Sequence, residues 1–189
     1  MRFRRDRDRR GAAADGLRAV VGAAGGQAEA AALAEAGPRG PGEAAMKHRV
    51  FLSKLEHESI VKAIGAAELR TSGEIRVYVA RGAVPEALRA AQKHFGQLGM
   101  HKTKERNGVL IFVAPKSQTF AIWGDAGVHE KCGEGFWKVL SEEMTGHLKR
   151  GEFTEAITHA IGKAGGLLAE HFPRRPGDKN ELPDTVIEE

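Results

Sequence analysis

The chain has 189 residues, of which 41% are apolar and 29% charged, and its formal net charge is +4. This length accommodates one domain of ordinary size plus tails, and the composition is that of a soluble globular protein rather than a disordered or membrane-embedded one. The single cysteine, Cys132, excludes an intramolecular disulfide framework and a multi-cysteine zinc module. No apolar run reaches the length of a membrane span, so we expect a cytoplasmic protein without a transmembrane segment.

Residues 1–45 consist almost entirely of Arg, Ala, Gly, Glu, Asp and Pro. So few large apolar side chains cannot offset the entropy of ordering, which predicts a low-complexity tail, disordered or at most transiently helical around Leu17–Ala36. Its basic start has two interpretations: an RNA-binding arm, or a start codon assigned too early, with the protein beginning at Met46. The remaining body is close to charge-balanced, which disfavours nucleic-acid binding outside residues 1–45.

Downstream of Met46, hydrophobic periodicity and turn residues predict seven elements. In chain order they are a helix, a strand, a helix, two strands and two helices, at residues 52–70, 74–80, 84–99, 108–114, 119–123, 134–149 and 153–172. The first strand alternates, with Ile75 expected to point inward and Arg76 outward. The run Gly108–Ala114 is continuously apolar, as expected of a central strand buried on both faces.

The order of these elements predicts the topology. A strand, a helix and a second strand form a right-handed crossover with parallel strands, and the short turn Pro115–Gln118 makes the third strand antiparallel. We therefore predict an α/β fold at residues 46–172, a single three-layer domain with a small mixed β-sheet (a βαββ core) flanked by helices on both faces. Residues 173–189 are predicted to be an extended or loose C-terminal tail.

In this topology the starts of the first two strands and the end of the third meet along one rim of the sheet. The polar residues brought there are Ser72, Glu74, Glu105, Arg106, Asn107 and Asp125, followed by Glu130. Oxygen donors at strand ends suit Ca²⁺ or Mg²⁺, with Glu74, Glu105, Asp125 and Glu130 as candidate ligands. Phosphate would be contacted by Arg106, Asn107, Lys102 and Lys104, and Asp125 with Arg106 is the candidate catalytic pair.

Two simpler interpretations stay open. Strand ends are polar in most proteins, so Arg106 could pair with a neighbouring carboxylate while Asp125 caps a turn. Cys132 follows His129 in a stretch that lacks the second histidine of a zinc-binding helix, and a lone cysteine is more often a small hydrophobic residue than a nucleophile.

Three segments of the sequence resemble the TPM-domain family. They are the strand beginning at Thr71-Ser-Gly-Glu-Ile-Arg-Val, the run Arg106-Asn-Gly-Val-Leu-Ile-Phe-Val-Ala-Pro, and Phe120-Ala-Ile-Trp-Gly-Asp-Ala-Gly after the hairpin. The family includes bacterial envelope proteins and thylakoid-lumen acid phosphatase-like proteins. The resemblance implies a mixed sheet between helices, a divalent-metal site that holds calcium in some members, and weak phosphatase activity.

The sequence departs from the family pattern in two places. Typical members carry a signal peptide and often a C-terminal membrane helix, and their Gly-aromatic-Gly turn is replaced here by Gly124-Asp-Ala-Gly. The first functional hypothesis is a metal-binding TPM domain with weak phosphatase activity. The alternative is a non-catalytic scaffold domain that binds an unknown protein partner.

Overall fold

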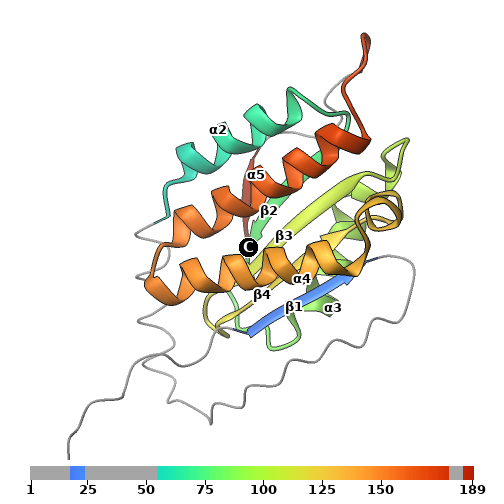
Figure 1. Cartoon of the computed structure of the whole chain (residues 1–189). Helices are drawn as coiled ribbons and strands as arrows, with labels where there is room; N and C mark the ends of the chain where they lie inside the picture. The colour runs from blue at the N-terminus through green and yellow to red at the C-terminus, as the bar shows by residue number, and fades with distance from the viewer. Residues whose placement is uncertain (1–17, 24–54, 179–184) are drawn as a thin grey trace, which may run out of the picture.

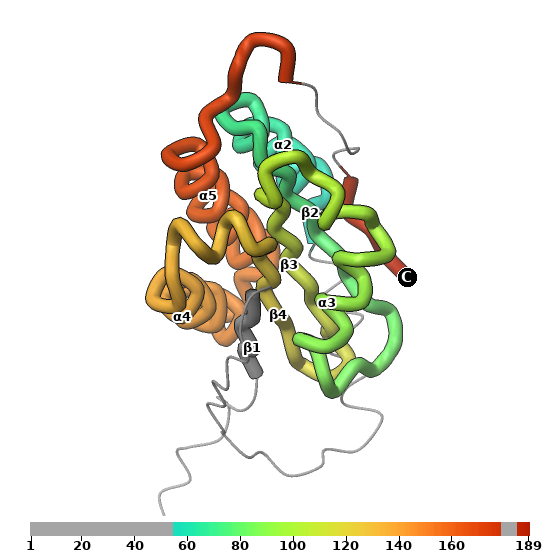
Figure 2. Tube along the Cα trace, turned by 90° about the vertical axis from the view of Figure 1, so that its right-hand side faces the viewer, coloured from blue at the N-terminus to red at the C-terminus, as the bar shows by residue number. Residues whose placement is uncertain are grey.

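The computed structural model describes residues 18–23, 55–178 and 185–189. Within these residues, helices and one mixed sheet form three layers, with α2, α4 and α5 on one face of the sheet and α3 on the other (Figure 2). The predicted α/β fold, a mixed sheet between helices, is confirmed. No helix in the described part of the chain is long and apolar enough to cross a membrane.

Figure 1 labels the elements of this fold. In chain order they are β1 (Arg18–Ala23), α2 (His57–Glu68), β2 (Glu74–Val79), α3 (Ala87–Gln97), the short 3₁₀ helix η1 (Met100–Lys102), β3 (Gly108–Ala114), β4 (Thr119–Gly124), α4 (Ala126–Arg150), α5 (Phe153–His171) and β5 (Val186–Glu188).

The sheet has the strand order β1-β4-β3-β2-β5. Strands β2 and β3 are parallel, with Glu74 opposite Gly108, and β3 and β4 are antiparallel, with Val109 opposite Gly124. The starts of β2 and β3 and the end of β4 therefore lie at the same end of the sheet. This arrangement confirms that the three polar segments meet at one rim.

Both faces of the sheet are covered by helices, as predicted. The larger core lies between the sheet and α2, α4 and α5, and a smaller one lies between the sheet and α3. Ile75 lies in the larger core, as the alternation of β2 predicts, but Arg76, which was expected to point outward, is also buried, at 2% exposure. Its guanidinium Nη2 lies 3.8 Å from Oε2 of the equally buried Glu74.

Helix α4 begins at Ala126, earlier than the predicted start near Glu134. The difference comes from Gly133, whose φ of 65° and ψ of −178° are not helical and kink the element. A pattern rich in glycine disfavours helix, so the sequence indicates only the part after the kink. The short first part positions Asp125, as described below.

Two segments expected to lie in tails add edge strands to the sheet. Arg18–Ala23 pairs in parallel with β4, where we expected a tail without regular structure, and most of residues 1–45 lies outside the described residues. Val186–Glu188 pairs in parallel with β2, where we expected a tail that is extended or loose but not part of the sheet. Distant parts of the chain thus cover the outer edges of β4 and β2, and the new edge strand β5 is only three residues long, a common way of limiting exposed strand edges.

Candidate functional site

The loop between η1 and β3 is a tight turn held by Thr103. The Oγ1 atom of Thr103 accepts a hydrogen bond from the backbone N–H of Asn107 at 3.1 Å, and its carbonyl accepts one from Arg106 at 3.1 Å. Arg106 has a φ of 52°, in the left-handed region that residues other than glycine adopt infrequently. The turn therefore fixes the backbone from which the Arg106 side chain projects.

Arg106 and Asp125 form a bidentate ion pair across the rim. The guanidinium Nε and Nη2 atoms each donate to a different carboxylate oxygen of Asp125 at 2.8 Å. Asp125 is fully buried, whereas the Arg106 side chain is 51% exposed. The hydrogen bond with Asp125, more than its charge, raises the pKa of the arginine. The carboxylate thus holds one edge of the guanidinium and leaves the other toward solvent.

Asp125 is itself placed by two elements. Its backbone N–H donates to the carbonyl of Gly108 at 2.9 Å, which ties it to the start of β3. Its Oδ1 accepts from the N–H of Ala126 at 2.8 Å, so that Asp125 is the N-cap of α4. The simpler interpretation of the sequence, in which Arg106 pairs with a carboxylate and Asp125 is a cap, describes these contacts.

Gly127 lets the helix approach the loop. A Cβ atom at this position would lie 2.4 Å from the carbonyl oxygen of Glu105 and 2.8 Å from that of Arg106. Both neighbours are backbone atoms, which cannot move aside as the end of a side chain can. Only glycine therefore allows the first turn of α4 to pack on this loop in the observed position.

A second group of hydrogen bonds lies beside the ion pair. Ser72, just before β2, donates its hydroxyl to Oε2 of Glu105 at 2.7 Å, and the amide Nδ2 of Asn107 donates to the same hydroxyl oxygen at 3.2 Å. Oε1 of Glu105 lies 3.6 Å from Nη2 of Arg175. Ser72 and Glu105 are partly exposed and Asn107 is buried, so this group joins the inside of the rim to its surface.

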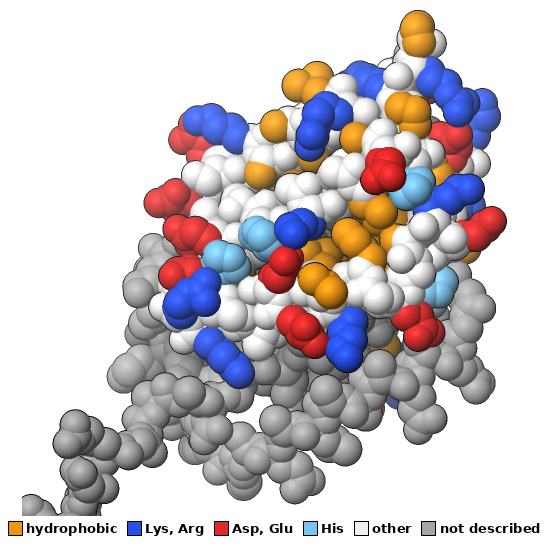
Figure 3. Space-filling model, viewed as in Figure 1, with side chains coloured by type: hydrophobic (Ala, Val, Ile, Leu, Met, Phe, Trp, Pro, Cys, Tyr) orange, Lys and Arg blue, Asp and Glu red, His pale blue; other side chains and the backbone are white. Residues whose placement is uncertain are grey.

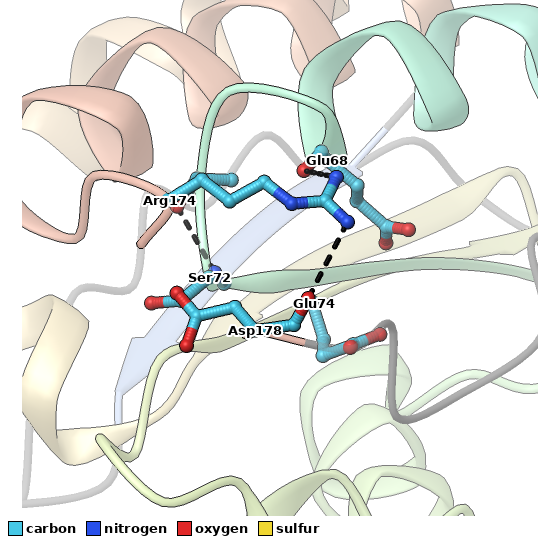
Figure 4. A pocket seen from close by; sticks show the side chains of 7 residues that line it. Glu68, Ser72, Glu74, Arg174 and Asp178 are labelled. Carbon is cyan, nitrogen blue, oxygen red and sulfur yellow. Dashed lines mark hydrogen bonds between the residues drawn. The ribbon is translucent and has the colours of Figure 1, made fainter. Parts of the chain in front are cut away.

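A small pocket lies beside Ser72 (Figure 4). Its lining comes from the end of α2, the start of β2 and the segment after α5, and consists of Glu68, Thr71, Ser72, Gly73, Glu74, Arg174 and Asp178. Arg174 donates to the carbonyls of Glu68 at 3.4 Å and Asp178 at 3.5 Å, both long hydrogen bonds. Arg174 is exposed, so the pocket places a guanidinium next to the rim.

The four candidate metal ligands are not gathered into one set. Glu74 faces Arg76, Glu105 binds Ser72, Asp125 binds Arg106, and Glu130 is exposed on α4. Among the residues that the structure describes, no group of three or more His, Cys, Asp or Glu side chains is arranged to hold a metal ion. Two of the predicted phosphate contacts are exposed: Lys102 is the last residue of η1, and Lys104 lies on the loop that carries Arg106.

Sequence reasoning missed Arg174 and Arg175. They reach the rim because Pro173 forms an antiparallel bridge with Thr71, and the N–H of Ser72 donates to the carbonyl of Phe172 at 3.0 Å. These contacts join residues about a hundred positions apart. Neither periodicity nor a turn motif marks them, so no local signal predicts that these arginines belong to the site.

Cys132 lies outside this group and is half-buried. Burial raises the pKa of its thiol to about 11. Since the thiolate is the reactive form, we expect iodoacetamide at pH 8 to modify the native protein about 100-fold more slowly than the urea-unfolded protein. Quantifying the modified fraction by mass spectrometry over time checks this, and equal rates in the two states would show that burial does not suppress the thiolate.

The charges on the face formed by α2, α4 and α5 are mixed. Figure 3 shows acidic and basic side chains interspersed over the face formed by α2, α4 and α5, with apolar side chains between them. Two of the acidic side chains are neutralised locally: Glu143 contacts His159 and Lys163, and Glu152 contacts Arg150. This face is therefore not the continuous basic surface that binding to a nucleic-acid backbone requires.

Comparison with known proteins identifies the family. No curated protein matches the chain. The NMR structure of the BA42 protein from the psychrophilic bacterium Bizionia argentinensis is similar, with 38% sequence identity and a TM-score of 0.65, and the match covers 70% of this chain and 92% of that one. The family model for the TPM domain matches residues 46–167, which contain the whole rim except Arg174 and Arg175. The chain therefore belongs to the TPM-domain family.

Proposed function

We propose that this TPM domain binds a phosphate-bearing ligand at the rim, through the outer edge of the Arg106 guanidinium. The observation that carries the proposal is the ion pair with Asp125, which orients the group but leaves 51% of the side chain exposed. Arginine has five N–H donors, and the pair uses two of them. A planar, preoriented guanidinium is well suited to bidentate contact with phosphate oxygens.

The surrounding charges favour an anion over a cation. Near the surface of the rim the basic side chains Lys102, Lys104, Arg106 and Arg175 outnumber the acidic Glu105 and Glu130. The buried carboxylates Asp125 and Glu74 each lie beside an arginine. A divalent ion bound by Asp125 would have to displace Arg106 or lie beside its positive charge. The candidate metal ligands therefore do not fit a resident ion in the observed arrangement, and the proposal needs none.

Slow hydrolysis of phosphate esters is the second part of the proposal. Ser72 and Glu105 form a hydroxyl–carboxylate pair 2.7 Å apart. In the proposed step the Ser72 oxygen bonds to phosphorus while Glu105 takes its proton as a general base, the P–O bond to the alcohol breaks, and the leaving alkoxide takes a proton from water. A second water then hydrolyses the phosphoserine and releases phosphate. The buried carboxylates of the rim, Asp125 and Glu74, are each paired with an arginine. No buried carboxylate of the rim described here is thus free to protonate a leaving group, and we expect weak turnover.

Calorimetry with inorganic phosphate tests the binding. We expect saturable heat with the full chain and roughly fivefold weaker binding for a Lys102→Gln/Lys104→Gln variant, because two positive charges near the anion are lost. The matched control is Lys116→Gln/Lys149→Gln, which removes two exposed lysines, one in the turn at the other end of the β3–β4 hairpin and one in the last turn of α4, and should bind as the wild type does.

Calorimetry with different ligands also distinguishes between the competing functions. Heat with CaCl₂ or MgCl₂ but none with phosphate would replace the proposal by a metal-binding function. No heat with either ligand would favour the alternative in which the TPM domain is a scaffold for a protein partner. Equal phosphate affinities of the Lys102→Gln/Lys104→Gln variant and its control would show that the anion does not bind near Lys102 and Lys104.

A further inference from the structure

The edge of β2 is covered by the last residues of the described chain. In β5, Val186 lies opposite Val77, Ile187 opposite Tyr78 and Glu188 opposite Val79, all in parallel register. The pairing continues beyond the strand, since the N–H of Arg81 donates to the carbonyl of Glu189 at 2.6 Å. This is the backbone geometry by which an extended peptide adds to a sheet edge.

Each side chain of this segment has its own contacts. Val186 packs against the larger core and Ile187 against the smaller one, on opposite faces of the sheet. Glu188 lies 2.5 Å from Nε2 of His57 and 3.5 Å from Nη2 of Arg81. The edge thus accepts two apolar side chains, one on each face, and then provides basic groups for an acidic one.

The residue after the strand extends the same pattern. The hydroxyl of Tyr78 donates to Oε2 of Glu189 at 3.3 Å. Burial raises the pKa of this tyrosine, and the nearby Glu189 carboxylate raises it further. Four consecutive residues, two apolar and two acidic, therefore match the side chains along this edge.

We infer that the β2 edge is a peptide-binding edge for an extended segment of a partner protein, with two apolar residues followed by two acidic ones, and that residues 186–189 occupy it as an intramolecular competitor. The charge complementarity with His57 and Arg81 defines the partner's chemistry. The strand is three residues long, and each of its side chains is only partly buried. A short, half-exposed strand at the sheet edge belongs to the low-stability part of a fold, so a partner can displace it.

Competition within one chain predicts how binding should depend on β5. A tethered segment competes at an effective concentration in the millimolar range, so the intact chain should bind a short peptide weakly. Removing the apolar contacts of β5 should expose the edge. The probe is the synthetic peptide Thr-Val-Ile-Glu-Glu, and the observable is the shift of the backbone amide signals of Val79 and Arg81 in NMR titrations.

We expect the full-length Val186→Asp/Ile187→Asp variant to bind the peptide at least tenfold more tightly than the wild type. A peptide with lysine in place of both glutamates should bind this variant at least tenfold more weakly. Adding Arg81→Glu should remove the preference for the acidic peptide, whereas Arg89→Glu, on the exposed side of α3, should leave it unchanged. Equal binding of the peptide by the wild type and a folded Val186→Asp/Ile187→Asp variant would overturn the inference. An Arg81→Glu substitution with no effect on the preference for the acidic peptide would overturn it as well.

A second variant tests the inference if the first one does not fold. Glu188→Lys/Glu189→Lys keeps the apolar residues and removes only the acidic contacts, and it should bind the acidic peptide more tightly than the wild type. Failure of both variants to bind better than the wild type contradicts the inference. Dimers of the wild type in sedimentation experiments at the same concentrations, with the amides of Val79 and Arg81 shifted, would overturn it in favour of strand exchange between two copies.

Discussion

Replacing Gly127 with alanine should lower the free energy of unfolding by about 3 kcal/mol, a large effect for one methyl group. The added Cβ would lie 2.4 Å from the carbonyl oxygen of Glu105, much closer than real Cβ contacts. Relief requires the first turn of α4 or the backbone of the loop to shift. Either movement would also separate Arg106 from Asp125. Urea unfolding followed by circular dichroism measures the change.

The matched control for this substitution is Gly162→Ala. Gly162 lies on α5, and a Cβ there would have no atom within 4 Å. Alanine is favoured over glycine in a helix, so this variant should be as stable as the wild type or more stable by about 0.5–1 kcal/mol. Equal effects at the two positions would contradict the account of the loop packing.

Replacing Asp125 with asparagine should cost about 2 kcal/mol, since hydrogen bonds to charged groups contribute roughly 1.5–3 kcal/mol and Arg106 can regain water. Asparagine is as good an N-cap as aspartate, so this variant isolates the loss of the ion pair. Asp125→Ala also removes the cap and should cost about 1 kcal/mol more. Thermal and urea unfolding of the two variants measure both steps.

Glu142→Gln is the control for the loss of a negative charge. Glu142 is exposed on the same helix as the cap and should contribute little when neutralised. An Asp125→Asn variant that is as stable as Glu142→Gln would show that the pair with Arg106 contributes little to stability. The capping contribution could still be measured from the alanine variant.

The rim was predictable from the sequence because its causes are local. Gly108–Ala114 is a continuous apolar run between polar turns, and the structure places β3 at those residues. The hairpin after Ala114 then fixes β4 as antiparallel, which brings Asp125 to the same end of the sheet as Arg106. Hydrophobic pattern and turn length were sufficient for this part of the fold.

The sequence did not predict which side chains pair with one another within the rim. Four carboxylates in a sequence suggest a cation site, but their partners decide their chemistry. Asp125 faces Arg106, and Glu105 faces Ser72 and Arg175. Arg175 reaches Glu105 only because the chain after α5 crosses to Thr71, and such a contact leaves no periodic trace in the sequence.

The edge strands were missed for a related reason. Val186–Glu188 is too short to show an alternating pattern, and its pairing with β2 depends on an edge that exists only after the rest of the domain has folded. The alternation predicted Arg76 on the face opposite Ile75, but it could not show that this side chain is buried at 2% exposure beside Glu74. Tertiary contacts, rather than propensity, determine these features.

The central claim is that Asp125 orients Arg106 so that its free edge binds an oxyanion. The most direct test follows the Nε–Hε signal of Arg106 by ¹H–¹⁵N NMR while inorganic phosphate is added to the full chain. We predict a signal that is resolved before addition, because Nε donates to Asp125, and that shifts saturably with a dissociation constant of about 1 mM. A signal that stays unchanged up to roughly 50 mM phosphate, well above that range, would contradict the account.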